Sequence, residues 1–552
     1  MSFIYRRVSK MLSMCAQGGG IKEILHKKED KSIKKIYFLL HKALEDLDIL
    51  NRVYTKYLSE ICKNKFLGIV LLCVLVQRKK IDGGGKLKKE IMKREKEILH
   101  FYNTLKEKEE KKNCTRQILK IKKLKKYFII YDQDEKKNDI LEKLRTLFPV
   151  EEDEDVENLY EIESDKVGAL VSTTTYKENK IRIIDKTSCL VVQAGEIKEG
   201  MVIVDVCSAP GSKAILSLML LKEKGYLICI EKNKKRCFTL LQEILKQNHD
   251  YGGIYLDESF TDCKKFDFNE QNFFINYKDT HVYYIKHRYN DILMKIYNAD
   301  FFHLSEEDFS SFGKIDVVFV DPSCSSSGMP DFVHKHRMQQ IFGNSFESGE
   351  GDGEGLVSGK GDNEEMASWK GDIEELVSGK GDNEEMASWK GDIEELVSGK
   401  GDNEEMASWN VDTRGMASKQ EDLNPISNFL EQVAEGRIPR VPRPFQEKVK
   451  NLAKFQTKIL NHALDTLKIA KTFIYSTCSF FEEENEHVIE SVLQSNPNFS
   501  LEKAGKEKFL FTSGTSAVSR KCVRTFPAQH SCRGIFISKL LRSSGGLEQE
   551  PC

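Results

Sequence analysis

The chain has 552 residues, 14 cysteines and a formal net charge of −1, from 85 lysines and arginines against 86 aspartates and glutamates. The cysteines form no Cys-x-x-Cys pair, and a chain this long is not a small disulfide-stapled scaffold. The longest apolar run, residues 66–76, is too short for a bilayer about 30 Å thick, and residues 1–17 lack the apolar core of a secretory signal. We therefore expect a soluble protein of a reduced, intracellular compartment, without membrane association and without a metal site.

The near-neutral charge is an average over unlike parts of the chain. Residues 1–130 hold 33 basic and 14 acidic residues, a net of +19, whereas residues 351–410 hold 17 acidic residues and 5 lysines, a net of −12. Outside that acidic segment, 80 basic residues stand against 69 acidic ones, a net of +11. A basic region of this size attracts polyanions, most often nucleic acid, although an ordinary solvated lysine-rich surface has the same composition.

The N-terminal part of the chain predicts helices. Apolar side chains over residues 33–47 recur at the spacing of a buried helix face, and residues 66–76 form a second, almost wholly apolar helix. A glycine turn at residues 83–85 precedes a lysine-rich helix over residues 86–112. We predict a small basic helical domain over residues 1–125.

Residues 126–190 predict a small mixed α/β region. Residues 127–130 and a segment that begins at Ile181 are strand candidates, because they are rich in aromatic and β-branched side chains. Residues 151–155 are predicted to be an acidic loop. The lysines of residues 120–126 are either a phosphate-contacting strip or a solvated face.

From Met201 onward, buried strands alternate with helices. Four near-continuous apolar runs have the character of strands that are covered on both faces of a parallel sheet. These runs are residues 202–206, 226–231, 315–321 and 473–478. Their alternation with helices predicts a doubly wound α/β fold.

Two inserts interrupt this pattern. Residues 251–296 are rich in Asn, Tyr and Asp and fall between the helix after the second strand and the next segment of the site. Residues 346–422 contain a repeat with a period of 20 residues, rich in Gly, Asp and Ser, that holds all three tryptophans of the chain. Such a composition cannot bury enough apolar surface to offset the chain entropy of folding. We expect this repeat to be a disordered acidic loop outside the folded core.

The segment after the first predicted strand is suited to binding a nucleoside. Residues 205–213 read Asp-Val-Cys-Ser-Ala-Pro-Gly-Ser-Lys, and they open a helix. Small residues and the free N–H groups of a helix start let a ligand approach the backbone closely. Glu231 ends the next strand, where an acid is placed to accept hydrogen bonds from the two hydroxyls of a ribose.

Two cysteines follow later strands of the same predicted sheet. Cys324 lies in residues 321–328, Asp-Pro-Ser-Cys-Ser-Ser-Ser-Gly, and Cys478 lies in residues 475–479, Tyr-Ser-Thr-Cys-Ser. Ligands of open α/β sheets bind at the carboxyl ends of the strands, so both thiols should face one crevice. A lone cysteine is more often a small buried hydrophobe, but two at two strand ends favour nucleophilic catalysis by a thiolate.

These three segments, in this order, resemble those of the Sun-domain (Fmu-type) RNA cytosine-C5 methyltransferases. Further phrases that match the family are residues 184–189, 306–309, 455–456, 483–486, 525–527 and 534–538. Within the family, the chain is most similar to the branch that methylates large-subunit ribosomal RNA. The residues that support this branch are 20–22, 83–85, 306–309 and 321–330. The resemblance covers about residues 180–345 and 425–542, and it is weaker before them.

The resemblance implies an α/β fold with a Rossmann-like class I methyltransferase sheet. That domain would comprise residues 191–345 and 423–545 and would use S-adenosyl-L-methionine. Residues 126–190 would position RNA beside it. The basic helical N-terminal domain and the disordered acidic insert at residues 346–422 complete the expected organisation.

The resemblance also implies the roles of the catalytic residues. Cys478 would be the nucleophile that adds to C6 of cytosine, so that C5 becomes reactive enough to take a methyl group. Cys324 would assist breakdown of the covalent adduct and release of the product. Asp321 is placed to hydrogen-bond the cytosine edge as charge develops at N3. Lys213 borders the site, where it either lowers the pKa of a thiol or holds the cofactor.

For the cofactor, the resemblance implies that Glu231 binds the ribose, Arg236 supports that loop and Asp308 contacts the adenine amino group. The full set of expected cofactor-binding residues is Cys207, Ser208, Ala209, Pro210, Gly211, Ser212, Lys213, Glu231, Arg236, Asp308 and Asp321. The sequence departs from the family at Ala214, usually Thr, at Glu231, usually Asp, and at Ser326, usually Gly. None of these changes removes a required functional group, so we expect an active enzyme.

The segment after Cys478 contains four further polar residues of interest. Glu483 and Glu484 are interpreted as acids in the first turn of a helix, where the helix dipole favours them. Asn485 is interpreted as orienting the loop that carries Cys478. His487 is expected to lie on the surface.

We therefore expect an enzyme that forms 5-methylcytosine in RNA with S-adenosyl-L-methionine as cofactor. Large-subunit rRNA or a pre-ribosome is the expected partner, with a monomeric state and a location in the nucleus and nucleolus. A tRNA substrate is the alternative within the same class. A ribosome-assembly RNA-binding scaffold, whose catalysis is secondary or lost, is the alternative from another class, and the presence of both cysteines and the acids disfavours it.

Overall fold

The computed structural model describes most of the chain outside the acidic repeat. The described residues are 3–16, 33–83, 85–112, 125–131, 134–246, 251–256, 265–266, 281–287, 291–329, 332, 425–511 and 516–543. The predicted disordered insert at residues 346–422 lies outside them, as do residues 120–124 of the lysine stretch. Within the described ranges, no helix has both the length and the apolar character needed to cross a membrane.

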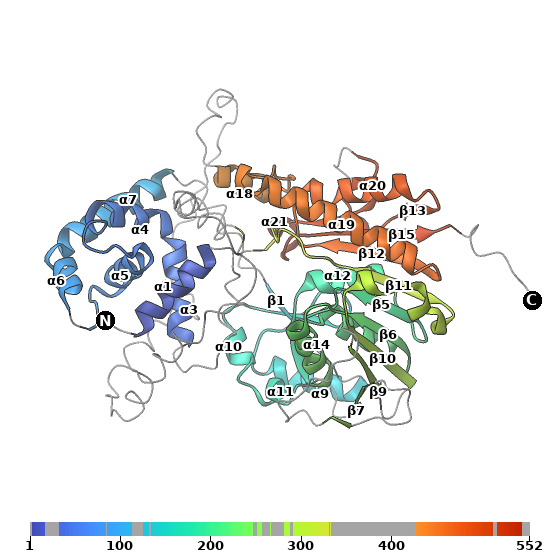
Figure 1. Ribbon diagram of the computed structural model, residues 1–552. Helices are drawn as coiled ribbons and strands as arrows, with labels where there is room; N and C mark the ends of the chain where they lie inside the picture. Colours follow the sequence, from blue (N-terminus) through green and yellow to red (C-terminus); the bar gives the residue numbers. More distant parts are fainter. Residues whose placement is uncertain are drawn as a thin grey trace, which may run out of the picture.

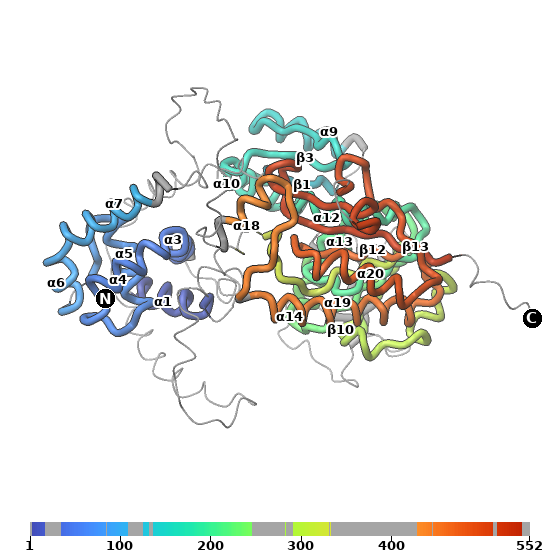
Figure 2. Tube along the Cα trace, turned by 90° about the horizontal axis from the view of Figure 1, so that it is seen from above, coloured from blue at the N-terminus to red at the C-terminus, as the bar shows by residue number. Residues whose placement is uncertain are grey.

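The helices before residue 113 pack around an apolar core of their own and lie beside the α/β part of the molecule (Figures 1 and 2). These helices are α1 (Phe3–Ala16), α3 (Ile33–Glu45), α4 (Leu47–Tyr57), α5 (Lys65–Arg78), α6 (Lys86–Lys93) and α7 (Glu95–Lys112). Helix α5 is central to this core, because every side chain from Ile69 to Leu75 is buried. An apolar helix that is too short for a bilayer is thus covered by neighbouring helices instead.

The predicted helices over residues 33–47 and 66–76 are confirmed. The prediction of one long helix over residues 86–112 is wrong, because the chain turns at Arg94 and forms two helices. The Arg94 guanidinium donates a hydrogen bond to the Tyr57 carbonyl at 3.4 Å, and this contact fixes the turn against α4.

A small antiparallel sheet follows, with strand order β2-β3-β1-β4. Its strands are β1 (Lys126–Ile130), β2 (Glu151–Glu152), β3 (Leu159–Ile162) and β4 (Ile181–Ile184), and its helices are α9 (Asp134–Arg145), α10 (Val167–Leu170) and α11 (Thr174–Lys177). The two strands predicted over residues 127–130 and from Ile181 are therefore confirmed as β1 and β4.

The prediction of a plain acidic loop at residues 151–155 is wrong. Its first two residues form β2, and the carboxylates of Asp153 and Asp155 are buried. Lys186 Nζ lies 2.6 Å from Asp153 Oδ2 and 2.8 Å from Asp155 Oδ2, and Lys508 also pairs with Asp155. These ion pairs join the small sheet to the large one, which explains why acids in a loop are buried.

The large sheet has a parallel centre of five strands, in the spatial order β10-β6-β5-β11-β12. The strands are β5 (Val202–Val206), β6 (Lys224–Ile230), β10 (Asp291–Asn298), β11 (Ile315–Val320) and β12 (Ala470–Thr477). Numbered along the chain, this is the 3-2-1-4-5 order of a doubly wound sheet. The strand order reverses between β5 and β11, so ligands are expected to bind there, beyond the carboxyl ends of the strands.

Antiparallel strands extend this sheet on both sides. Beyond β12 lie β15 (Ile535–Arg542), β13 (Phe499–Glu502) and β14 (Val523–Thr525); beyond β10 lie β9 (His281–His287), β7 (Tyr251–Leu256) and β8 (Lys265–Phe266). The interpretation of residues 251–296 as an insert is therefore wrong for residues 291–296, which belong to the core strand β10. Ile292, Met294 and Ile296, at every second position of β10, are buried. The sequence before this strand is rich in Asn and Tyr, and for that reason the sequence pattern did not indicate a core strand.

Helices cover both faces of the parallel centre, as predicted for a doubly wound fold (Figure 1). One face packs against α12 (Lys186–Ala194), α13 (Ser212–Leu221) and α14 (Lys234–Lys246), and the other against α19 (Gln446–Thr466) and α20 (Glu486–Ser495). Neighbouring residues of β5 point to opposite faces, since Ile203 belongs to the first core and Val204 to the second. The short helices α18 (Pro425–Ala434) and α21 (Pro527–His530) lie near the loops after β12.

Candidate active site

The first segment of the site connects β5 to α13, and its Lys213 forms an ion triad with buried Asp205 and partly exposed Asp321. Lys213 Nζ lies 2.9 Å from Asp321 Oδ2 and 3.6 Å from Asp205 Oδ1. Burial raises the pKa of Asp205 to about 7. Burial opposes the charged form of Lys213, but the two carboxylates raise its pKa above the ordinary value. Lys213 thus lies between two acids, a position that suits it to hold Asp321 in place rather than to contact a thiol.

Gly211 shapes the turn that opens α13. Its φ of +107° lies in the left-handed region, and a Cβ there would come within 2.7 Å of Leu240 Cδ1 on α14. Arg236, also on α14, donates a hydrogen bond from Nη2 to the Ala209 carbonyl at 2.5 Å. The segment over residues 207–212 is therefore fastened to α14.

Glu231 follows β6 and carries a buried acceptor without a hydrogen-bond donor. Its Oε1 accepts a hydrogen bond from the Asn233 N–H at 2.8 Å. Its Oε2 has no hydrogen-bond partner in the described part of the chain, and Arg236 Nη1 approaches it only to 3.7 Å. A buried acceptor left unpaired costs about 1–3 kcal/mol, so a ligand that offers hydroxyl groups would stabilise this carboxylate.

Asp308 lies at the expected edge of the sheet, but its carboxylate bonds to its own turn. It lies in a 3-10 turn (Glu306–Asp308) beyond β10, and its carbonyl accepts a hydrogen bond from the Tyr297 hydroxyl at 3.1 Å. Its carboxylate closes its own turn, since Oδ2 accepts from the Ser305 N–H at 2.8 Å. The structure brings Asp308 to the same edge of the sheet as Glu231, but the side chain is engaged locally.

Cys324 and Cys478 meet at the ends of two neighbouring strands, β11 and β12. Their Sγ atoms are 2.9 Å apart. The hydrogen bond from the Cys324 thiol lowers the pKa of Cys478, against the effect of burial, and the Ser326 hydroxyl adds to this lowering. The same contact and burial raise the pKa of Cys324 well above the ordinary value. Of the two thiols, Cys478 is therefore the more readily deprotonated, and Cys324 is the one that holds its proton more firmly.

Two neighbouring residues sharpen this assignment. Ser326 has a φ of 60°, a conformation that glycine adopts without strain, and its hydroxyl acts on Cys478. Cys207 also lies at this edge, but burial raises its pKa to about 12, so it is a poor nucleophile at neutral pH. Of the cysteines that follow the parallel strands, only Cys478 has a lowered thiol pKa in the described part of the chain.

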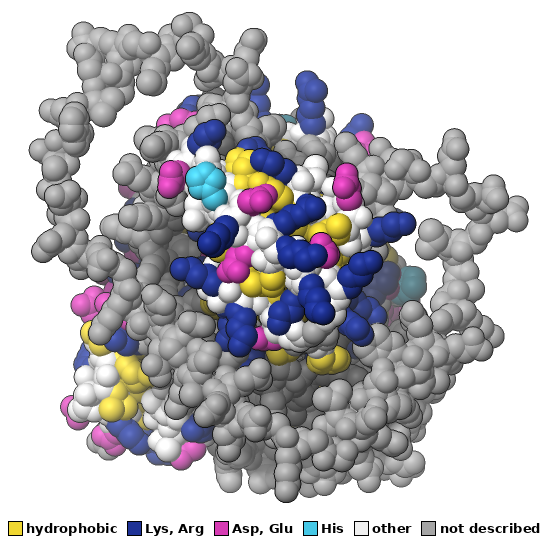
Figure 3. Space-filling view, turned by 90° about the vertical axis from the view of Figure 1, so that its left-hand side faces the viewer, with side chains coloured by type: hydrophobic (Ala, Val, Ile, Leu, Met, Phe, Trp, Pro, Cys, Tyr) yellow, Lys and Arg dark blue, Asp and Glu magenta, His cyan; other side chains and the backbone are white. Residues whose placement is uncertain are grey.

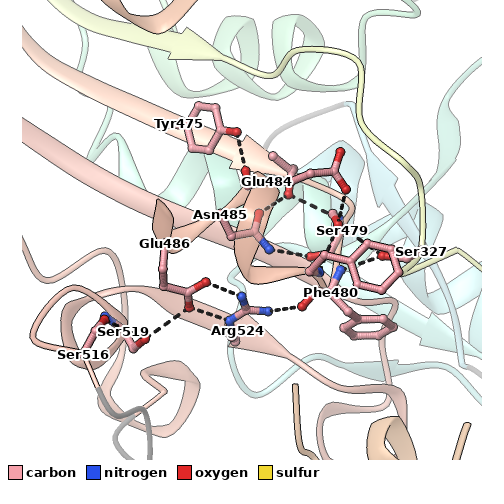
Figure 4. A network of polar contacts seen from close by, with 12 residues as sticks. Ser327, Tyr475, Ser479, Phe480, Glu484, Asn485, Glu486, Ser516, Ser519 and Arg524 are labelled. Atoms are coloured by element: carbon pink, nitrogen blue, oxygen red, sulfur yellow. Dashed lines mark hydrogen bonds and ion pairs between the residues drawn. The ribbon is translucent and has the colours of Figure 1, made fainter. Parts of the chain in front are cut away.

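A buried polar network surrounds the two cysteine loops (Figure 4). Glu484 is fully buried and accepts hydrogen bonds from the Ser325 N–H at 2.8 Å, the Ser479 hydroxyl at 2.6 Å and Gln456 Nε2 at 3.0 Å. The interpretation of Glu484 as a first-turn acid favoured by the helix dipole is therefore wrong. It precedes α20 and points into the interior, where serine and amide donors replace water.

The interpretation of Asn485 agrees with the structure. Its Oδ1 accepts a hydrogen bond from the Thr477 hydroxyl at 2.5 Å, and its Nδ2 donates one to the Ser479 carbonyl at 2.9 Å. Asn485 is therefore hydrogen-bonded to both neighbours of Cys478. Glu486 forms a buried ion pair with Arg524, which also donates to the Phe480 carbonyl at 3.0 Å (Figure 4). His487 is exposed, as expected.

Sequence reasoning missed the part that Glu484 and Gln456 play in this site. Both lie in short segments that resemble the family, residues 483–486 and 455–456. This resemblance was the one feature of the sequence that could have indicated a role in the site. Nothing in the spacing indicated that the two side chains meet, with Gln456 Nε2 also 3.0 Å from the Ser323 carbonyl.

The fold and the site together define a doubly wound α/β protein with a buried acceptor at Glu231 and two paired thiols at the ends of β11 and β12. Residues 436–541 match the family model described as 16S rRNA methyltransferase RsmB/F. This match confirms, over that segment, the resemblance to the Sun-domain methyltransferases that the sequence motifs indicate.

Curated relatives resemble shorter stretches. A 28S rRNA (cytosine-C(5))-methyltransferase of Drosophila melanogaster is 38% identical over 68 residues, 12% of this chain and 16% of that protein. The Mus musculus protein of the same description is 33% identical over 119 residues, 21% of this chain and 24% of that protein. A 26S rRNA (cytosine-C(5))-methyltransferase of Caenorhabditis elegans is 38% identical over 96 residues, 17% of this chain and 21% of that protein. The chain thus matches less than a quarter of the length of each of these relatives.

Among solved structures, a methyltransferase homolog protein from Pyrococcus horikoshii aligns with a TM-score of 0.40 and 14% identity. The alignment covers 76% of this chain and 87% of that one.

Proposed function

We propose that the protein is an S-adenosyl-L-methionine-dependent methyltransferase that forms 5-methylcytosine in RNA, with large-subunit rRNA as its substrate. The observation that carries the proposal is the contact of Cys324 and Cys478 at 2.9 Å, beyond two strands that neighbour the nucleoside-binding edge. The family match over residues 436–541 and the descriptions of the eukaryotic relatives support the reaction and the substrate.

The proposed mechanism begins at Cys478. Its thiolate forms a bond to C6 of cytosine, and the electron pair of the C5–C6 double bond becomes available at C5. We assign Asp321, held by Lys213, to the cytosine edge, where its carboxylate accepts a hydrogen bond from the 4-amino group, and from N3–H once that nitrogen is protonated. When bound, S-adenosyl-L-methionine supplies an electrophilic methyl group for C5.

Breakdown of the adduct needs a proton acceptor and a leaving group. C5 must lose its proton, the C5–C6 double bond must form again, and the bond from C6 to Cys478 must break so that the thiolate returns. Cys324 is the neighbouring thiol, and we assign it to this step: once it has given up its own proton, its thiolate accepts the proton from C5, and the electron pair of the C6–S bond returns to Cys478. The contact with Cys478 and burial raise the pKa of Cys324, so its thiolate is the stronger base of the pair.

The residues present fit the cofactor that the family implies. Glu231 Oε2 is a buried acceptor without a donor in the described part of the chain, and the N-terminus of α13 with its tight Gly211 turn lies beyond the adjacent strand. We assign Glu231 to the ribose hydroxyls, Arg236 to the support of that loop, and Asp308 to the adenine end.

Replacement of Glu231 by glutamine should weaken S-adenosyl-L-methionine binding about 10- to 100-fold, because hydrogen bonds to a charged group contribute about 1.5–3 kcal/mol. Isothermal titration calorimetry measures this directly. The matched control is Glu223→Gln, which changes an exposed glutamate just before β6 and should leave the dissociation constant unchanged. Equal affinities for the wild type and Glu231→Gln would remove Glu231 from the cofactor site.

The RNA partner is supported by a basic face on the helical unit (Figure 3). The exposed lysines Lys86, Lys89 and Lys93 follow one side of α6, opposite the buried Ile91. The neighbouring segments also carry exposed basic residues: Lys79, Lys80, Arg94 and Lys96. Such a row of lysines suits contact with a phosphate backbone.

Neutralising the basic α6 face should weaken RNA binding and its salt dependence. In the triple variant Lys86→Gln/Lys89→Gln/Lys93→Gln, the slope of log affinity against log salt should fall by about 1 for each of these lysines that binds a phosphate in the wild type. Binding isotherms over a range of salt concentrations measure the slope. A triple Lys→Gln control at three scattered exposed lysines, Lys177, Lys471 and Lys503, removes the same charge and should change the slope less. Equal slopes for the two triple variants would contradict an RNA-contacting role for this face.

The remaining parts of the proposal concern organisation and location. We propose that residues 1–125, 126–190, and 191–345 with 423–545 are separate domains, that the protein is monomeric, and that it acts in the nucleus and nucleolus. The eukaryotic relatives act by their descriptions on 28S or 26S rRNA, which supports this location.

Radiolabelled methyl transfer to total RNA, followed by size separation and nucleoside analysis, tests the proposed function. We expect the label in large-subunit rRNA and in 5-methylcytidine. Label confined to small RNAs would move the substrate to tRNA. RNA binding without any label would instead favour the ribosome-assembly scaffold.

A further inference from the structure

The buried carboxylate of Glu484 lies between the two cysteine loops and contacts both. On the Cys324 side, its Oε1 accepts from the N–H of Ser325, at 2.8 Å. On the Cys478 side, its Oε2 accepts from the hydroxyl of Ser479, at 2.6 Å. Each of these serines directly follows its cysteine, so one side chain joins the two reactive positions.

A second link reinforces the first. Gln456, on α19, donates from Nε2 to Glu484 Oε1 and to the Ser323 carbonyl, both at 3.0 Å. Ser323 directly precedes Cys324. The hydroxyls of Ser325 and Ser479 also lie 3.1 Å apart. Ser325 is therefore bonded directly to the element that follows Cys478, and Ser323 is linked to it through Gln456.

A buried carboxylate is an unusual choice for joining two loops, because an apolar side chain could fill the same space. An isolated buried carboxylate is costly, and it is tolerated here because three donors satisfy it. Hydrogen bonds to a charged group are shorter and roughly twice as strong as neutral ones, so the carboxylate fixes the loops more firmly than an amide would. Its negative charge also acts on both thiols, whose pKa values it raises.

We propose that Glu484 is a positioning residue that holds the Cys324 and Cys478 loops at the separation needed for thiol cooperation. This role rests on the proposed function, because cooperation has meaning only if the two thiols act on one substrate. The geometric part of the proposal can be tested without RNA or cofactor.

The rate of disulfide formation between Cys324 and Cys478 measures the separation of the loops. The probe is diamide, a two-electron oxidant: the two thiols lose two protons and two electrons, and diamide is reduced to its hydrazine. Glu484→Ala should slow this reaction by about 10- to 100-fold, the scale on which small misplacements act. Glu483→Ala, a change at the adjacent and less buried glutamate, is the matched control and should oxidise at the wild-type rate.

A pH profile separates positioning from a purely electrostatic effect. Removing the charge of Glu484 without moving the loops would lower the pKa of Cys478, because that charge raises it. Separating the loops would weaken the hydrogen bond from Cys324 and raise the pKa of Cys478 instead. We therefore expect the pH midpoint of Cys478 alkylation by iodoacetamide to rise in Glu484→Ala, with the other thiols followed by peptide mass spectrometry.

Activity gives the third readout. Glu484→Ala should lower kcat for RNA methylation and leave the KM values for RNA and cofactor near the wild-type values, and Glu484→Gln, which keeps one acceptor, should be intermediate. If Glu484→Ala does not fold, Ser479→Ala cuts the same link with a smaller change and should show a weaker slowing of disulfide formation. An unchanged disulfide rate, or an alkylation midpoint that falls, in a folded variant would overturn the proposal. A slowed disulfide in a protein that methylates no RNA would instead contradict the proposed function alone.

Discussion

Cys478→Ala should abolish methyl transfer to RNA, with a loss of about 10⁴-fold or more, as expected when a covalent nucleophile is removed. Alanine cannot form the bond to C6, and the neighbouring Cys324 has a raised pKa that makes it a poor substitute. The measurement is the initial rate of radiolabelled methyl transfer to total RNA, with the melting temperature recorded for each variant.

The control for this loss is another cysteine. Cys532→Ala changes a buried thiol that follows α21 and should keep the wild-type rate unless it lowers stability. Full activity in Cys478→Ala would show that the reaction does not use this thiol.

Cys324→Ala should have a different effect: a covalent complex of protein and RNA should accumulate. Cys478 can still add to cytosine, but without Cys324 the breakdown of the adduct should slow by about 10²- to 10⁴-fold, the usual contribution of general acid–base catalysis. The adduct is detected as an RNA-bound species that survives denaturation and disappears after RNase treatment.

The double variant Cys324→Ala/Cys478→Ala provides the comparison, and it should form no adduct. Turnover of Cys324→Ala at the wild-type rate, with no adduct, would contradict the assigned role. An adduct in the double variant would point to another nucleophile.

Sequence patterns predict four of the five strands of the parallel centre, β5, β6, β11 and β12, because these strands are buried on both faces. Such strands are continuous apolar runs, as in residues 202–206 and 315–321, and they end in the polar residues that form the site. The convergence of Cys324 and Cys478 follows from this rule alone, since parallel strands end at one edge.

Strands whose neighbouring sequence is polar, and strands at the edges of the sheet, are not predicted by this rule. In β10, Ile292, Met294 and Ile296 are buried, but Lys295 interrupts the apolar run and the strand lies in a segment that resembles an insert in composition. The outer strands β13, β14 and β15 are antiparallel to the centre, and their pairing depends on contacts distant in sequence.

The interior polar contacts are the part of the site that sequence predicts least. A glutamate before a helix normally faces water near the helix dipole, and Glu484 differs only because Ser325, Ser479 and Gln456 provide donors in the folded chain. Lys213 is similar: its neighbours Asp205 and Asp321 come from two strands, so its pairing with both acids depends on their adjacency.

Trapping with RNA that contains 5-fluorocytosine tests the central claim most directly. Fluorine at C5 leaves no proton to remove after methyl transfer, so the bond from sulfur to C6 persists and the modified peptide can be identified by mass spectrometry. We predict that the wild-type protein, given S-adenosyl-L-methionine and this RNA, is trapped through Cys478 within residues 475–479. Attachment at Cys324, or methylation of ordinary RNA by a protein that the fluorinated RNA never traps, would contradict the assignment of Cys478 as the nucleophile.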